Sequence, residues 1–327
     1  MAKTKITIIG LGLVGCSIGK GLCQGAREFE VVGHDREPAA AAAARKAHAV
    51  DRTEWNLISA VTGADLIILA LPGQAIRATM EAMAQDLKPG CIVTDTASVK
   101  APVLRWAAEL LPNTVHFVGG DPILNDPGGA GGADGATADL LRGAVYCLCP
   151  APATAPEAVR VVADLAERLG ARPLFLDAAE HDGLIAGVDQ LPALVAAALI
   201  SATAVTGPWH EMRKLAGSQY AAATQILAAD PTTYSDAILA NSENSIRWLD
   251  LYIAALQHWR QLIAEGEGET LAKEIHKVMD AHAVWLRQRA SGRWEEGEGV
   301  DLSEVGGSWR SLFGLRPRPP ERRERQS

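Results

Sequence analysis

Three glycines near the start of the chain have the spacing of a phosphate-binding turn. Residues 6–9 are β-prone and lead directly into Gly10-x-Gly12-x-x-Gly15, and an apolar, helix-compatible pattern follows. The first glycine permits a tight strand-to-helix turn, the second lets backbone N–H groups approach a pyrophosphate, and the third allows close helix–strand packing. The N-terminus of the helix adds positive potential for the phosphates. The pattern therefore predicts a dinucleotide site.

An acidic residue stands where such a site needs one. A second predicted strand, residues 30–34, ends at Asp35, about 20 residues beyond the last glycine. A carboxylate there accepts hydrogen bonds from ribose hydroxyls and repels a 2′-phosphate, although Arg36 could turn toward a phosphate. We therefore expect NAD as the cofactor rather than NADP. The candidate cofactor-binding residues are Gly10, Gly12, Leu13, Val14, Gly15, Asp35, Arg36, Leu71, Pro72 and Ser98.

Short apolar strands alternate with helix-compatible runs along the first half of the chain. Residues 64–72 form a continuous apolar run of the kind that is buried on both faces of a parallel sheet. Further predicted strands cover residues 91–95, 115–118, 144–149 and 173–176. This order is typical of a doubly wound α/β sheet, in which ligands bind beyond the carboxyl ends of the strands. The loops that should open onto this crevice are residues 10–15, 71–74, 95–100 and 119–126.

A second domain is expected after residue 178, where strand patterns stop and helical patterns dominate. We predict a Rossmann-like NAD(P)-binding domain over residues 1–178, an all-α domain over 179–315 and a Pro- and Arg-rich disordered tail over 316–327. The helix from Pro192 is apolar nearly all round, which predicts burial in a core or a subunit interface. Residues 126–139 are mainly glycine and alanine, which predicts a mobile loop, either a lid over the substrate or a tolerated insertion.

Composition excludes several classes of protein. The 327 residues carry a net charge of −8, with 48% hydrophobic and 21% charged residues. These values are typical of a soluble globular protein, and the negative charge argues against a nucleic-acid-binding surface. The run after Pro192 is interrupted by Ser201 and Thr203, so no uninterrupted apolar run has the length of a membrane span. The start of the chain lacks a signal-peptide pattern, and the five cysteines lack metal-ligand spacing. We therefore expect a cytoplasmic protein with no metal site and neither nucleic acid nor membrane as a partner.

Five segments of the chain together resemble the prephenate/arogenate dehydrogenase family. They are residues 10–17, 95–100, 118–123, 180–182 with 189–192, and 229–236 with Asn241. The family has an N-terminal NAD(P)-binding domain and a helical dimerisation domain, so the resemblance implies a homodimer joined through residues beyond about 180. It also implies oxidative decarboxylation of a small cyclohexadienol carboxylic acid, as in tyrosine biosynthesis. In that reaction the cofactor carries the redox chemistry, and the protein supplies orientation, a base and carboxylate recognition.

The resemblance assigns roles to some polar residues. A serine in the Asp-x-x-Ser-Val-Lys segment is expected near the substrate hydroxyl and the nicotinamide, which transfers to Ser98. Locally, Ser98 fits equally well as the N-cap of the helix that follows. His181 is either part of the site or structural, capping a helix or holding the two domains together. The arginine for the substrate carboxylate corresponds to Arg213, or to Ala221 if residues 217–220 are the anchor.

Two departures from the family pattern bear on the substrate. The family usually has a histidine as base where this chain has Asp121, and a second histidine where it has Gln190. A free aspartate, with a pKa of about 3.9 against about 6.5 for histidine, is the weaker base at neutral pH. It also repels a dicarboxylate such as prephenate. We therefore expect slow or absent turnover of prephenate and a preference for a neutral, zwitterionic or cationic substrate, unless Asp121 only caps a loop.

Two alternatives to such a dehydrogenase remain open at this point. One is a different hydride-transfer enzyme on the same two-domain plan, of the hydroxyacid or imine reductase type. The other is a catalytically weak NAD-binding protein that senses or scaffolds. The loss of the usual base favours the second alternative, whereas the retained Ser98 and Lys100 favour an enzyme.

Overall fold

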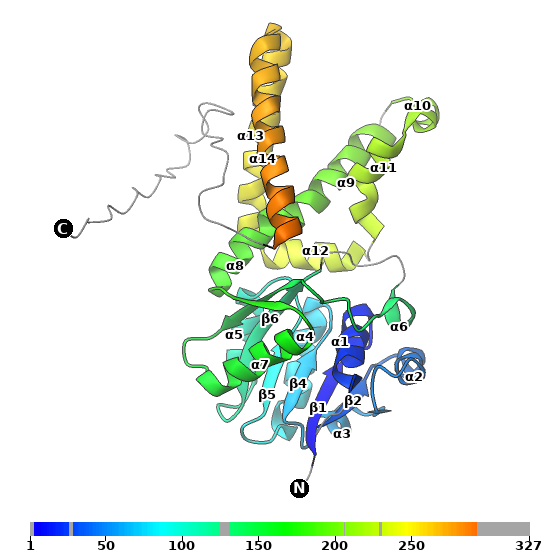
Figure 1. Cartoon of the computed structure of the whole chain (residues 1–327), viewed down its shortest axis with the longest axis vertical. Helices are drawn as coiled ribbons and strands as arrows, with labels where there is room; N and C mark the ends of the chain where they lie inside the picture. The colour runs from blue at the N-terminus through cyan, green and yellow to red at the C-terminus, as the bar shows by residue number, and fades with distance from the viewer. Residues whose placement is uncertain (1–2, 26–28, 125–130, 206, 229–230, 293–327) are drawn as a thin grey trace, which may run out of the picture. The chain divides into compact units, whose positions relative to one another are not determined.

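The computed structural model describes residues 3–25, 29–124, 131–205, 207–228 and 231–292. The chain forms two compact units, Met1–Ser245 and Ile246–Ser327. The first unit holds an eight-stranded sheet with helices on both faces, and the second holds long helices (Figure 1). The predicted domain boundary at residue 178 stays a prediction, and the tail at 316–327 lies outside the described residues.

The sheet has the strand order β3-β2-β1-β4-β5-β6-β7-β8. Its strands are β1 Thr4–Ile9, β2 Phe29–His34, β3 Arg52–Thr53, β4 Leu66–Leu69, β5 Ile92–Asp95, β6 His116–Ile123, β7 Val145–Pro150 and β8 Arg172–Phe175. All neighbouring pairs are parallel except β6 and β7, which are antiparallel. The order changes direction between β1 and β4, and ligands in such sheets bind beyond the carboxyl ends of the strands at this switch. The predicted doubly wound α/β class is confirmed.

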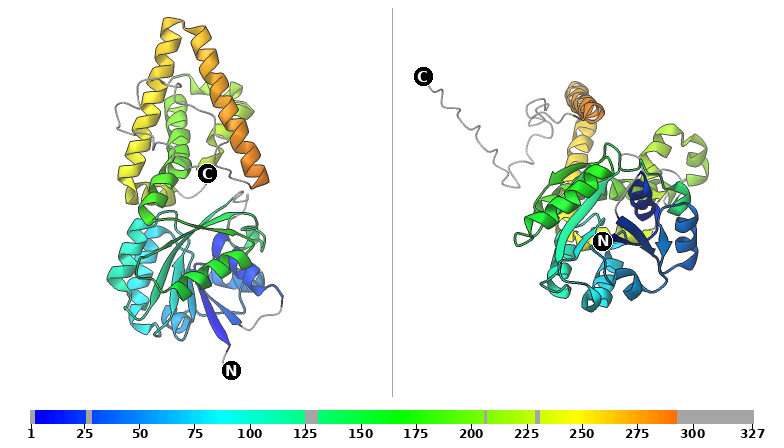
Figure 2. Two further views of the ribbon diagram at one scale, coloured as in Figure 1. Left: turned by 60° about the vertical axis from the view of Figure 1, so that its left-hand side comes forward. Right: turned by 60° about the horizontal axis from the view of Figure 1, so that its bottom comes forward.

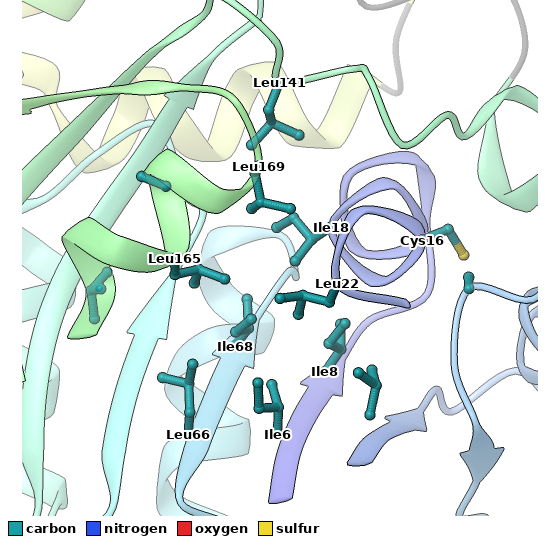
Figure 3. Packing of buried hydrophobic residues seen from close by; sticks show 14 of the residues in the cluster. Ile6, Ile8, Cys16, Ile18, Leu22, Leu66, Ile68, Leu141, Leu165 and Leu169 are labelled. Carbon is teal, nitrogen blue, oxygen red and sulfur yellow. The ribbon is translucent and has the colours of Figure 1, made fainter. Parts of the chain in front are cut away.

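Helices cover both faces of the sheet. In chain order they are α1 Leu13–Cys23, α2 Pro38–Lys46, α3 Leu57–Val61, α4 Gly73–Met83, α5 Ala101–Leu110, α6 Gly132–Gly135 and α7 Pro156–Arg168. Figure 3 shows α1 packing through Ile18 and Leu22 on one face, beside Leu165 of α7. On the other face Ile76 of α4 and Val103 of α5 pack against Ile67 and its neighbours. Because β4 is buried on both faces, it reads in sequence as an unbroken apolar run.

Strand β6 is longer than its sequence pattern predicted. It continues through Gly119 and Asp121 to Ile123, because the antiparallel β7 pairs with it over this whole length, Asp121 facing Cys147. Asp121 therefore lies on a strand and not in the predicted loop. The register of β5 with β6 stops at Thr94 and Val118, so Asp121 lies beyond the carboxyl end of β5.

The glycine- and alanine-rich segment is ordered where the structure describes it, at residues 131–139. Ala133 and Ala136 are buried against α1, in the same apolar cluster as Ile18. Lys20 of α1 donates to the Ala136 carbonyl at 2.7 Å, and the Ser17 hydroxyl accepts from Thr137 N at 3.1 Å. The prediction of a mobile loop is wrong for these residues, because small side chains allow the backbone to lie directly on the helix. Residues 125–130 lie outside the described residues.

The described residues after 178 are helical. The helices are α8 Ala178–Ile185, α9 Leu191–Ala204, α10 Trp209–Leu215, α11 Ser218–Thr224, α12 Pro231–Ala240, α13 Ser242–Glu265 and α14 Gly268–Ser291. A π-helical turn, η2 Ala186–Gln190, joins α8 to α9, and a 3₁₀ turn, η3 Gln225–Ala228, follows α11. The predicted all-α character of this region is confirmed.

The continuous helix Ala178–Ala204 is long and apolar enough, by length and composition alone, to cross a membrane. Its apolar run is bounded by Gln190 and interrupted by Ser201 and Thr203, so the length appears only in the mean hydropathy of the whole helix. Only 28% of its most apolar window is buried, and within α9 only Ala193 and Ala196 are fully buried. Of the two alternatives predicted for α9, burial in a core does not hold within the single chain, and burial in a subunit interface stays a prediction. One such helix is weak evidence for a membrane span, because core helices of soluble proteins pass the same test of length and composition.

In the second unit, α13 and α14 are joined by a short turn at one end and diverge at the other (Figure 2). His258 Nε2 lies 2.9 and 3.1 Å from the two carboxylate oxygens of Glu274, which links the helices near the turn. Large apolar side chains are exposed along both helices. They include Ile253, Leu256, Ile263, Met279, Trp285 and Leu286.

Candidate active site

The glycine turn between β1 and α1 has the geometry of a phosphate cradle. Gly10 has a φ of +94°, and a Cβ there would lie 2.2 Å from the Ala70 carbonyl oxygen. A Cβ on Gly15 would lie 1.9 Å from the Gly10 carbonyl oxygen. A Cβ on Gly12 would meet no atom within 4 Å, and no side chain caps α1 at this residue. The open face of Gly12 and the uncapped helix start therefore leave room and N–H donors for an anion.

Asp35 follows β2 and ties this turn to the neighbouring strand. Its Oδ2 accepts from Leu11 N at 2.8 Å, and its Oδ1 accepts from Glu37 N at 2.9 Å. Arg36 is 87% exposed, with its Nε 3.6 Å from the Glu37 carboxylate. The remaining predicted cofactor residues flank the turn: Leu13 and Val14 begin α1, and Leu71 and Pro72 follow β4. The glycine turn and the adjacent carboxylate together fit a dinucleotide.

The start of α5 is capped by a residue from a distant helix. Asp182 of α8 accepts from Lys100 N at 2.6 Å and from Ala101 N at 2.9 Å. Helix α5 begins at Ala101 with Lys100 as its N-cap residue, so Ser98 does not cap it. That alternative for Ser98 is wrong. The half-buried Ser98 hydroxyl has no hydrogen-bond partner among the described residues, which leaves it free to bind a ligand.

A buried ion pair fixes the loop that carries Ser98. Lys100 is fully buried, and its Nζ donates to Asp95 Oδ2 at 2.5 Å and to the Gly120 carbonyl at 2.6 Å. Asp95 also accepts from Ala97 N and Gly120 N, each at 3.0 Å. The carboxyl end of β5 is thereby bound to β6 immediately before Asp121. Removing either partner would leave an uncompensated buried charge, so the pair holds both segments in place.

His181 lies buried between two aspartates. Its Nε2 is 3.1 Å from Asp121 Oδ2, and its Nδ1 is 3.0 Å from Asp182 Oδ1. Burial opposes the charged ring, but hydrogen bonds to Asp121, Asp182 and Cys147 outweigh it and raise the pKa of His181 to about 11. His181 is therefore an imidazolium at neutral pH. Asp121, 4% exposed, is paired with a cation, and its Oδ1 has no hydrogen-bond partner in the described part of the chain.

Asp189 is a second carboxyl near Asp121 and was missed as a site residue by sequence reasoning. It lies on the π-helical turn η2, and part of its side chain reaches solvent. Burial by the surrounding protein and then the charge of Asp121 raise the pKa of Asp189. Single π-turns inside α-helices are frequent at functional sites. In the sequence, the sign of a possible site residue was a carboxyl side chain directly before Gln190, the position at which the family resemblance places a histidine.

Gln190 is fully occupied by structural partners. Its Oε1 accepts from Ser245 Oγ at 2.7 Å and from Asn241 Nδ2 at 3.2 Å. Its Nε2 donates to the Ala237 carbonyl at 3.3 Å. Arg213 is exposed on α10 and bonds His210 at 3.1 Å. Among the described residues, the structure thus joins Asp121 to His181 by a hydrogen bond, and neither Gln190 nor Arg213 makes a hydrogen bond or ion pair with that pair.

Comparisons with known proteins agree with this architecture. The family model "Prephenate dehydrogenase, nucleotide-binding domain" matches residues 18–174, and "Prephenate dehydrogenase, dimerization domain" matches residues 177–277. A cyclohexadienyl dehydrogenase from Zymomonas mobilis is 31% identical over 84% of this chain and 94% of its own length. A prephenate dehydrogenase from Lactococcus lactis is 30% identical over 85% of this chain and 78% of its own length.

The chain belongs to the prephenate dehydrogenase family. It is therefore an NAD(P)-dependent oxidoreductase that acts on a CH–OH group, as the sequence predicted. It also carries the dimerisation domain of this family. Because the chain belongs to this family, the alternative of a different two-domain hydride-transfer enzyme, of the hydroxyacid or imine reductase type, is excluded.

A solved structure shows that the fold is shared. The prephenate dehydrogenase of Aquifex aeolicus, in complex with hydroxyphenyl propionate and NAD⁺, superposes with a TM-score of 0.79 at 23% identity. The match covers 85% of this chain and 97% of that protein.

Proposed function

We propose that the chain is an NAD-dependent dehydrogenase for an arogenate-type cyclohexadienol, which carries an ammonium group in addition to the two carboxylates that prephenate also has. The observation that carries this proposal is the Oδ1 of Asp121, which has no hydrogen-bond partner among the described residues although the residue as a whole is only 4% exposed, and which is therefore available to a substrate. The second supporting feature is Ser98, which has no structural task in capping α5. Ser98 follows β5 and Asp121 lies on β6, and the Asp95–Lys100 pair holds these two strands in place.

The choice of NAD is supported by Asp35. Its two oxygens hold Leu11 N and Glu37 N, which orients a full negative charge at the end of β2. This charge suits ribose hydroxyls and opposes a 2′-phosphate. Arg36, the residue able to offset it, is paired with Glu37. When bound, NAD⁺ accepts the hydride from the alcohol carbon.

The protein's part in the reaction is to receive the hydroxyl proton. Asp121 Oδ1 accepts the hydrogen bond of the substrate hydroxyl and then its proton, while Oδ2 remains bonded to the His181 imidazolium. His181 is a positioning residue, because both of its nitrogens are already engaged by aspartates. The Ser98 hydroxyl donates to or accepts from the same substrate oxygen. Gln190 and Arg213 take no part.

The charges at this site favour an amino group on the substrate. Four carboxyl groups lie in this part of the chain, and they face two cations, Lys100 and His181, that are already paired. The carboxyl groups are Asp95, Asp121, Asp182 and Asp189. Prephenate, with two carboxylates and no cation, would meet uncompensated negative charge here, whereas the ammonium group of arogenate would be attracted. Prephenate should therefore be the poorer substrate.

Substitution of Asp121 tests this assignment. Asp121→Asn keeps the shape but removes the base, so kcat with arogenate should fall by about 10²- to 10⁴-fold. The same change removes a negative charge, so the KM for prephenate should fall relative to that for arogenate. Glu180→Gln, on the same helix as His181 but exposed, is the matched control and should leave both parameters unchanged. An unchanged kcat in Asp121→Asn would remove Asp121 from the chemistry.

We further propose a cytoplasmic homodimer. Helix α9 is apolar but incompletely buried, and α13 and α14 expose large apolar side chains; each is expected to be covered by a second subunit. Light scattering of the purified chain at micromolar concentration should give twice the mass of one chain. A monomer under these conditions would contradict the proposal.

A further inference from the structure

The π-helical turn η2 carries a carboxyl group that no protein group binds. Asp189 is exposed, and its side chain makes no hydrogen bond or ion pair with any of the described residues. The next residue, Gln190, is held by three helical partners. The backbone that carries Asp189 is therefore fixed, while its carboxyl group remains available to a cation.

Asp189 lies toward the same side of its helix as His181. Helix α8, the turn η2 and α9 are parts of one continuous helix, residues 178–204. In a regular α-helix, with about 3.6 residues per turn, a residue eight positions after His181 would lie about 80° round the axis from it. In η2, however, Leu191 N donates to the Ala186 carbonyl, five residues earlier. This wider coil turns less per residue and brings Asp189 back toward the face of His181.

The carboxyl groups of Asp189 and Asp121 interact without touching. Two helical turns separate Asp189 from His181, a rise of about 11 Å. Side chains on a helix lean toward its N-terminus, so the Asp189 carboxyl leans toward His181 and the Asp121 bonded to it. The surrounding protein and then the charge of Asp121 raise the pKa of Asp189, yet no hydrogen bond joins the two carboxyl groups.

We propose that Asp189 binds the ammonium group of the substrate and thereby sets the preference for arogenate over prephenate. This inference rests on the proposed function. In an arogenate-type substrate, the hydroxyl and the side chain with the ammonium group are attached to opposite carbons of the ring. When the hydroxyl is at Asp121 Oδ1, the ammonium group lies across the ring from it, and Asp189 is the carboxyl group set apart from Asp121 along the helix.

The other carboxyl groups of the site are already engaged. Asp95 pairs with Lys100, and Asp182 accepts from the start of α5 and contacts His181. Asp121 keeps one oxygen, which the substrate hydroxyl takes. Of these four carboxyl groups, Asp189 is the one with both oxygens available among the described residues, and a carboxylate with an ammonium group makes a charge-assisted hydrogen bond. Prephenate has a keto oxygen in place of the ammonium group and offers no donor there.

Substitution of Asp189 should change binding of one substrate and not the other. Asp189→Asn keeps the shape and removes the charge, so the KM for arogenate should rise by about tenfold. Its kcat should stay the same, because the contact is distant from the reacting carbon and is lost equally from ground state and transition state. The KM for prephenate should not rise. Asp189→Glu, which keeps the charge, should recover part of the loss. Glu180→Gln, an exposed carboxyl on the same continuous helix, is the matched control and should change neither KM.

Calorimetry with a matched pair of ligands gives a second readout that needs no turnover. L-tyrosine, the aromatic product of arogenate, and 3-(4-hydroxyphenyl)propionate differ only in the amino group. In the presence of NAD⁺, Asp189→Asn should bind tyrosine about tenfold more weakly than the wild type does, and the propionate no more weakly. A protein that loses affinity for both ligands alike would show that Asp189 has only a structural role.

The kinetic results separate this inference from the proposed function. If the wild type prefers arogenate and Asp189→Asn keeps the same ratio of the two kcat/KM values, the inference is wrong while the proposed function stands. An equal loss with both substrates overturns the inference in the same way. If the wild type does not prefer arogenate, the proposed function fails, and the inference fails with it.

Discussion

Replacing His181 should destabilise the protein strongly at neutral pH. His181→Gln removes the cation that lies 3.1 Å from Asp121 and 3.0 Å from Asp182, both buried. Breaking a buried ion pair by removing one partner costs about 3–5 kcal/mol, because the remaining charge has no compensation. That loss is a large part of the ~5–15 kcal/mol by which domains are typically stable. Urea unfolding at pH 7 measures it directly.

A double substitution shows how much of the loss of stability comes from the uncompensated charge of Asp121 and how much from the lost packing of the His181 ring. In His181→Gln combined with Asp121→Asn, one of the two uncompensated carboxylates is gone, so this variant should be more stable than His181→Gln alone. We expect it to recover at least about 1 kcal/mol, within the range of couplings between contacting residues. A loss below about 1 kcal/mol in His181→Gln, or an equal loss in both backgrounds, would refute the ion-pair account.

The same residue predicts how stability depends on pH. The folded pKa of His181 is about 11, whereas an unfolded histidine titrates near 6.5. Below the unfolded pKa both states hold the proton and the full stabilisation is present. As pH rises toward 11 the unfolded chain releases the proton that the folded chain keeps, so stability falls by about 1.4 kcal/mol per pH unit. Between about pH 7 and 7.5 the unfolded thiols, with a pKa of about 8.5, are still mostly protonated, so the slope is measured there. It should be smaller in His181→Gln than in the wild type.

Further predictions concern the cofactor site. Gly12→Ala should fold with unchanged urea stability, because its Cβ meets no protein atom, but should bind NAD⁺ at least about tenfold more weakly in calorimetry. Gly15→Ala should instead lower the free energy of unfolding measured in urea, because its Cβ would lie 1.9 Å from the Gly10 carbonyl oxygen. Equal stability of the two variants would contradict this geometry of the turn. Asp35→Asn keeps a hydrogen-bond acceptor for Leu11 N but removes the negative charge, so the ratio of NADP affinity to NAD affinity should rise. An unchanged ratio would show that Asp35 does not select the cofactor.

The parts of this molecule that depend on local patterns were predictable from sequence. The glycine turn is encoded by three residues whose spacing reflects close backbone approaches, and each required glycine meets the expected neighbour or open space. Strand β4 is buried on both faces, so its apolar run is continuous and easily recognised. The order of strands and helices then determines the doubly wound sheet.

The site itself depends on contacts between distant residues, which local patterns do not contain. The cap of α5 comes from Asp182, a residue 82 positions after Lys100, so the adjacent Ser98 was a reasonable but wrong candidate for that role. His181 and Asp121 are separated by 60 positions, and the charge on His181 arises only because both aspartates reach it in the fold.

Similarly, β6 extends past its apolar segment because β7 supplies hydrogen-bond partners. Gln190 was expected at the substrate, but its amide is held by three helical partners.

The central claim is that the chain oxidises an amino-bearing cyclohexadienol with NAD⁺ in preference to prephenate, whose two carboxylates are not offset by an ammonium group. The direct measurement is steady-state reduction of NAD⁺ by the purified full-length chain, with arogenate and prephenate compared over a range of concentrations. We predict that arogenate is turned over with a kcat/KM at least about tenfold above that for prephenate. The reason is that attraction of the ammonium group to this negatively charged site should lower the activation free energy by more than about 1.4 kcal/mol. An equal or higher kcat/KM for prephenate would contradict this preference. If the chain binds NAD⁺ but turns over neither substrate, it is a sensor or scaffold instead.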